Sequence, residues 1–128
     1  MIRVVVVDDQ TLVRVGLRTL LADEPDVELV GEAGDGREAL AVIRSVKPDV
    51  VLMDMGLPRC DGATAVRQIR SDPAFTGLRI FAVTASAPNG FDIPHGPAGI
   101  DRWFQKPLDP ASLLHELKQE LGASPCAV

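Results

Sequence analysis

The stretch Val4-Val5-Val6-Val7-Asp8-Asp9 decides the fold, because four consecutive β-branched residues lead directly into two acids. An unbroken apolar run of this kind is typical of a central strand in a parallel sheet that helices cover on both faces. Residues 50–53 form a similar run, Val-Val-Leu-Met, and Asp54 follows it. Two such strands, each followed by acid, predict an α/β domain with carboxylates at one edge of its sheet.

Further strands and helices alternate on the C-terminal side of the first run. Additional strands are predicted at residues 27–33, 79–83 and 102–105. Between the strands, apolar residues recur at the spacing of amphipathic helices, in three sets: Val13, Leu17, Leu20 and Leu21; Ala39, Val42, Ile43 and Val46; Ala65, Val66 and Ile69. A last helix is predicted from Pro110, which suits the first helical position, to Gly122, which suits a helix stop.

The segment from Ala85 to Gly99 interrupts this alternation. Six of its fifteen residues are Gly or Pro. In a helix interior each Gly costs about 1 kcal/mol and each Pro about 3 kcal/mol relative to Ala. We therefore predict that the helix between the fourth and fifth strands is short or absent.

The composition indicates one soluble domain, expected over residues 1–121 with a flexible tail at 122–128. Its 18 acidic and 13 basic residues give a net charge of −5, which argues against electrostatic binding of nucleic acid or anionic membrane. The two cysteines lack a metal-ligand spacing, and no secretory signal opens the chain. The apolar runs are too short to cross a bilayer, so a cytoplasmic protein is expected.

Five polar side chains are expected together at the carboxyl edge of the sheet. Asp8, Asp9 and Asp54 carry like charges, so their packing calls for a hard cation such as Mg²⁺. Thr84 and Lys106 end the fourth and fifth strands and supply a hydroxyl and a positive charge that would help to neutralise a phosphoryl group. A carboxylate can attack phosphorus. Asp54 is the predicted nucleophile, which leaves Asp8 and Asp9 for the cation.

These residues resemble the motifs of the response-regulator receiver domain of two-component signalling, a CheY-like, flavodoxin-like fold. Thr84 and Lys106 follow Asp54 by 30 and 52 residues, as in that family. Residues 2–62 are similar to receivers that precede LuxR-type helix-turn-helix domains. The resemblance implies three layers and a five-stranded parallel sheet in the order 2-1-3-4-5. The matching pieces cover nearly the whole chain: Val7-Asp8-Asp9, Leu52-Met53-Asp54, Pro58 with Asp61-Gly62, Val83-Thr84-Ala85 and Lys106-Pro107.

The resemblance implies that Asp54 accepts a phosphoryl group from a histidine kinase or a histidine phosphotransfer protein. It further implies that Asp9 and Asp54 hold Mg²⁺ with the backbone carbonyl of Gly56, and that Asp8 acts mainly through a bound water. The chain would catalyse only its own phosphorylation and dephosphorylation. It would signal to a downstream protein that the sequence does not identify, as a monomer or a homodimer.

The resemblance also assigns the remaining site residues. Thr84 and Lys106 would contact the phosphoryl oxygens. Trp103 occupies the place of a switch aromatic, usually Tyr or Phe, whose ring moves inward when the threonine, here Thr84, is drawn to the phosphate. Trp103 could instead simply fill a core edge. Arg14 and Arg18, four residues apart on the first helix, could dock a kinase, although a solvated helix face also accounts for them.

Three other functions stay open at this level. A pseudo-receiver would keep the fold and signal through protein contacts without phosphate. The chain could also be the excised regulatory domain of a DNA-binding response regulator, in which only a longer reading frame supplies the DNA contacts. A Mg²⁺-dependent phosphatase is the third, although such enzymes usually have more metal ligands.

Overall fold

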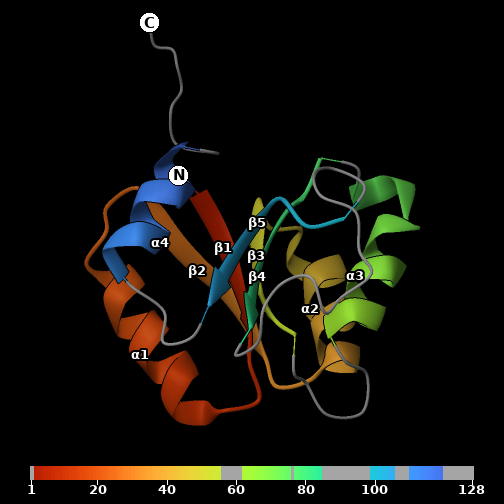
Figure 1. The fold of residues 1–128 in the computed structure, drawn as a ribbon, viewed down its shortest axis with the longest axis horizontal. Coiled ribbons are helices and arrows are strands. Elements are labelled where there is room, and N and C mark those ends of the chain that lie inside the picture. The colour runs from red at the N-terminus through yellow and green to blue at the C-terminus, as the bar shows by residue number, and fades with distance from the viewer. Residues whose placement is uncertain (1, 56–61, 76, 85–98, 106–109, 120–128) are drawn as a thin grey trace, which may run out of the picture.

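A parallel sheet forms the middle of the molecule in the computed structural model, which describes residues 2–55, 62–75, 77–84, 99–105 and 110–119. Its strands follow the order β2-β1-β3-β4-β5 (Figure 1), which confirms the predicted order. The strands are β1 (Ile2–Val7), β2 (Val27–Ala33), β3 (Val50–Asp54), β4 (Arg79–Thr84) and β5 (Arg102–Gln105).

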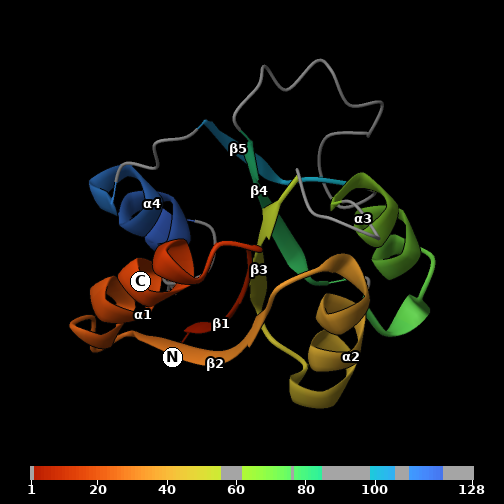
Figure 2. The same cartoon turned by 90° about the horizontal axis from the view of Figure 1, so that it is seen from below.

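Helices cover both faces of the sheet, as Figures 1 and 2 show from two directions. On one face lie α1 (Thr11–Ala22) and α4 (Pro110–Leu117), and on the other lie α2 (Gly36–Val46) and α3 (Gly62–Arg70). A short 3-10 helix, η1 (Pro73–Phe75), precedes β4. The three-layer fold is therefore confirmed. The predicted loss of the helix between β4 and β5 concerns residues 85–98, and the predicted tail concerns residues 122–128; both lie outside the described residues.

The two central strands supply side chains to both apolar layers. Along β1, Val4 and Val6 pack beneath α1 and α4, whereas Val5 and Val7 pack beneath α2 and α3. All four side chains are at most 1% exposed. Because both faces of this strand are buried, its side chains are apolar on both faces. The layer beneath α1 and α4 also contains the tilted ring pair of Phe81 and Phe104, whose centroids lie 5.7 Å apart.

The edge strand β2 is irregular where it meets α2. Its register with β1 shifts between Leu29 and Gly31, so that Val30 is the additional residue. A Cβ on Gly31 would lie 2.6 Å from a methyl carbon of Val42 on α2, so this close approach requires glycine. The Asp35 side chain then caps α2 by accepting from the Glu38 amide at 2.9 Å.

A buried ion pair joins α3 to the start of β5, at the amino edge of the sheet. The side chains of Arg70 and Asp101 are each 7% exposed, and Arg70 Nη2 lies 3.1 Å from Asp101 Oδ2. Arg70 also donates to the carbonyls of Gly99, at 2.9 Å, and Leu78, at 2.6 Å. Asp101 Oδ2 accepts from the Ile80 amide at 2.9 Å. Burial lowers the pKa of Arg70, and the opposing carboxylate of Asp101 partly offsets that cost.

Candidate functional site

Three strands end at the same carboxyl edge and carry the candidate site there. Asp8 directly follows β1, Asp54 is the last residue of β3, and Thr84 is the last residue of β4. Val7 lies beside Met53, one residue before each acid, so the β1–β3 register brings Asp8 and Asp54 to the same level. The parallel arrangement that the apolar runs predicted therefore gathers these side chains.

The carboxylates of Asp8, Asp9 and Asp54 form an acidic cluster. Each offers an oxygen, and these oxygens all lie within 4.8 Å of one another. Asp8 and Asp54 are only 3% and 5% exposed, whereas Asp9 is exposed. Like charges this close repel one another, and the two buried acids have little water to screen that repulsion. Hard oxygen ligands at this spacing suit a small divalent cation such as Mg²⁺.

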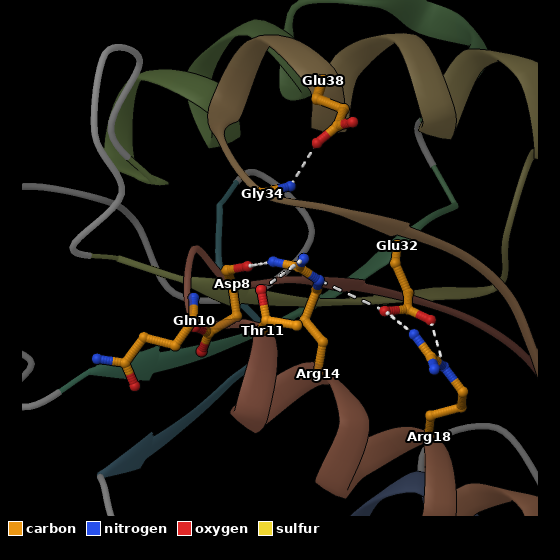
Figure 3. A network of polar contacts seen from close by, with 8 residues as sticks. All are labelled: Asp8, Gln10, Thr11, Arg14, Arg18, Glu32, Gly34 and Glu38. Carbon is orange, nitrogen blue, oxygen red and sulfur yellow. Dashed lines mark hydrogen bonds and ion pairs between the residues drawn. The ribbon is translucent and has the colours of Figure 1, made fainter.

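Hydrogen bonds fix the backbone and the carboxylate of Asp8. Its amide donates to the carbonyl of Ala33 at 3.0 Å, which extends the β1–β2 ladder by one residue. Its carbonyl accepts from the Arg14 guanidinium, and its carboxylate accepts from the Gln10 amide at 2.8 Å. These hydrogen bonds hold the turn between β1 and α1, and Figure 3 shows the one between the Asp8 carbonyl and Arg14.

Thr84 and Trp103 lie on the α2–α3 side of the sheet. Thr84 is 3% exposed and shares its strand parity with Ile80 and Ala82, which belong to the core beneath α2 and α3. Trp103 lies beside Ala82 in the β4–β5 register and packs, partly buried, against that same core. The sheet therefore places the predicted switch pair on one face. Whether the indole moves remains a prediction.

Two of the predicted site residues, Gly56 and Lys106, lie outside the described residues. Their roles stay predictions, and so does the magnesium-ligand role of the Gly56 carbonyl.

Both predicted docking arginines contact Glu32 on β2. Arg18 Nε and Nη2 lie 2.7 and 2.9 Å from the two oxygens of that carboxylate, and Arg14 Nε lies 3.4 Å from one of them. The hydrogen bond with Glu32 raises the pKa of Arg18. Both arginines therefore have an ion-pair partner within this chain. Their role in docking a kinase stays a prediction.

Sequence reasoning missed Glu32 and the pair of Arg70 and Asp101. Glu32 lies in the strand predicted at residues 27–33, and nothing in the spacing linked it to Arg14. Arg70 and Asp101 are 31 residues apart, on elements whose packing the sequence does not reveal. A charged residue at the end of an amphipathic helix gives no signal that its side chain is buried.

The fold and the acidic cluster together define a doubly wound α/β domain that gathers three carboxylates at the carboxyl edge of its sheet. Residues 4–118 match the family model of the response regulator receiver domain, and the chain belongs to that family.

Two solved structures of response regulators are similar to this chain in fold. The response regulator domain of Thermotoga maritima CheB has a TM-score of 0.81 and 29% identity, over 98% of this chain and 99% of that one. A LuxR-family two-component response regulator from Aurantimonas sp. SI85-9A1 has a TM-score of 0.81 and 35% identity, over 95% and 86%.

Similar relatives of greater length extend the comparison. The transcriptional regulatory protein YxjL of Bacillus subtilis is 47% identical over 91% of this chain and 53% of its own length. Response regulator GacA of Pseudomonas viridiflava is 38% identical over 92% and 54%. The chain thus spans about half the length of these relatives. Among the described residues, no helix is long and apolar enough to cross a membrane.

Proposed function

We propose that this chain is the phosphoacceptor receiver of a two-component or phosphorelay system. Asp54 takes a phosphoryl group from the phosphohistidine of a histidine kinase or a histidine phosphotransfer protein. The observation that carries the proposal is the acidic cluster at the carboxyl edge of a receiver-family sheet, with Asp54 at the end of β3.

Mg²⁺ fits the donor set, since the cluster offers carboxylate oxygens from three residues within 4.8 Å. Asp9 and Asp54, with the Gly56 carbonyl, are the proposed ligands, and Asp8 acts through a bound water. When bound, the ion supplies positive charge to the phosphoryl oxygens during transfer. The buried positions of Asp8 and Asp54 strengthen this electrostatic interaction relative to water.

Three residues of the chain have separate roles in phosphoryl transfer. A carboxylate oxygen of Asp54 attacks phosphorus, the bond from phosphorus to the histidine nitrogen breaks, and that nitrogen keeps the electron pair. The Thr84 hydroxyl donates a hydrogen bond to a phosphoryl oxygen, and the Lys106 ammonium pairs with another. Positioning and charge stabilisation account for the catalysis, as is usual in phosphoryl transfer. No substrate other than the chain itself is proposed.

Phosphorylation is proposed to draw Thr84 toward the new group and to change the environment of Trp103, the single tryptophan of the chain. We expect the Trp103 emission to shift on phosphorylation, because the indole packs partly buried on the face that Thr84 shares. A Thr84→Ala variant should accept phosphate more slowly and show no shift once labelled. Emission that stays unchanged in fully labelled native chain would make Trp103 a core residue only.

The remaining assignments follow from the receiver role. The receiver domain is proposed over residues 1–121, with 122–128 as a tail, in a cytoplasmic protein. This chain itself would signal to a downstream protein and make no direct contact with nucleic acid. A second candidate is the regulatory half of a DNA-binding response regulator. The relatives of about twice this length support it, since two of them are named transcriptional regulatory proteins. The native reading frame decides between the two.

Intact mass spectrometry tests the proposed function. The native chain is incubated with acetyl phosphate, once with Mg²⁺ and once with excess chelator. We expect the gain of one phosphoryl group with Mg²⁺ and little or none with the chelator. A native chain that gains none under either condition would favour the pseudo-receiver, which signals through protein contacts alone.

A further inference from the structure

Arg14 on α1 contacts both the turn that carries Asp8 and the edge strand β2. It is the fourth residue of α1, and its side chain is 21% exposed. One Nη donates to the backbone carbonyl of Asp8, and the other lies 3.4 Å from the Thr11 hydroxyl. Its Nε lies 3.4 Å from Glu32 on β2. Figure 3 shows this guanidinium between the turn that carries Asp8 and the edge strand.

Glu32 is itself held in place from its other side. Arg18, one turn further along α1, binds the same carboxylate through two nitrogens at 2.7 and 2.9 Å. A bidentate pair of this geometry fixes the orientation of the carboxylate. Glu32 therefore contacts both arginines of α1, whereas the described hydrogen bond to the Asp8 carbonyl comes from Arg14.

We infer that Arg14 is a positioning residue for the magnesium site. This inference rests on the proposed function. Its planar guanidinium spans the Asp8 carbonyl and Glu32 and so sets the backbone from which the Asp8 and Asp9 carboxylates project. It touches Asp8 through the backbone carbonyl in these contacts, so it acts on the site through the turn. Arg18 binds Glu32 and makes no described contact with that turn.

A positioning role and a purely electrostatic role of Arg14 predict opposite changes in Mg²⁺ affinity when Arg14 is replaced, which makes the inference testable. Arg14 is a cation beside an acidic cluster. Removing its charge therefore makes the electrostatic potential at the cluster more negative, which attracts Mg²⁺ more strongly. If charge were its only role, Arg14→Met would bind Mg²⁺ more tightly, and Arg18→Met would change affinity in the same direction. If Arg14 positions the turn, Arg14→Met binds Mg²⁺ more weakly, while Arg18→Met does not.

The experiment combines calorimetric titration with Mg²⁺ and amide hydrogen exchange of the metal-free chain. We expect Arg14→Met to lower Mg²⁺ affinity by roughly tenfold, the scale seen when residues that orient metal ligands are removed. We also expect faster exchange at the amides of Asp8 and Gln10, which donate to Ala33 and to the Asp8 carboxylate. Arg18→Met should show native exchange at both amides and an affinity no lower than native.

Equal effects of the two substitutions, or tighter Mg²⁺ binding by Arg14→Met with unchanged exchange, would overturn the inference. If the native chain bound no Mg²⁺, the proposed function would fail, but the exchange rates would still decide whether Arg14 orders the turn. Should Arg14→Met not fold, Arg14→Lys serves the same test. Its single ammonium keeps the charge but does not span the two acceptors as the planar fork does.

Discussion

Replacing Asp54 by asparagine is expected to abolish Mg²⁺-dependent phosphorylation. The amide keeps nearly the shape of the carboxylate at this 5% exposed position but is a poor nucleophile toward phosphorus. It also removes one of the three charges that gather within 4.8 Å, which should weaken Mg²⁺ binding. Intact mass after incubation with acetyl phosphate and Mg²⁺ measures the effect, with the native chain beside it.

Asp26→Asn is the matched control for this substitution. Asp26 is exposed, and it directly precedes β2 at the amino edge of the sheet, away from the acidic cluster. The control should be labelled like the native chain. Equal labelling of Asp54→Asn and native chain would place the phosphoryl group elsewhere and contradict the assignment of the nucleophile.

Replacing Arg70 by methionine is expected to lower the free energy of unfolding by about 3 kcal/mol or more, which is typical when one partner of a buried ion pair is removed. The substitution leaves the Asp101 carboxylate buried without the guanidinium, and it also removes the donor to the carbonyls of Gly99 and Leu78. Each buried acceptor that loses its donor adds a desolvation cost. Urea unfolding followed by circular dichroism measures the change.

Arg18→Met provides the comparison for that measurement. Arg18 also pairs with a carboxylate at close range, but its side chain is 55% exposed. Exposed pairs contribute much less than buried ones, because water and salt screen them. Similar small losses for the two variants would mean that burial of the Arg70 pair contributes no additional stability.

Most of the fold could be predicted from the sequence, because the decisive signals are local. The unbroken apolar runs that became β1 and β3 are typical of strands in the middle of a covered sheet, and the helical spacing of apolar residues marked the faces that pack on it. Asp8, Asp9 and Asp54 could be placed together for the same reason. Asp8 and Asp9 follow β1, Asp54 ends β3, and parallel strands end at one edge.

The contacts that hold these elements depend on side chains far apart in the chain, which local patterns do not reveal. Glu32 looked like one more polar residue of an edge strand, yet it binds both Arg14 and Arg18. Arg70 follows the apolar residues that predicted α3, and no pattern in the sequence indicated that its side chain is buried against Asp101. Long charged side chains can lie along the surface or turn inward, and only tertiary packing decides between these conformations.

The central claim is that Asp54 carries an acyl phosphate formed with Mg²⁺, and reductive trapping tests it most directly. A first hydride from borohydride adds to the activated carbonyl of an aspartyl phosphate and expels phosphate, which leaves an aldehyde. A second hydride and a proton from water then reduce the aldehyde to the alcohol of homoserine. After treatment of the native chain with acetyl phosphate and Mg²⁺, peptide mass spectrometry should find homoserine at position 54, and not when a chelator replaces Mg²⁺. Homoserine at another aspartate, or a phosphoryl group that resists reduction, would contradict the account.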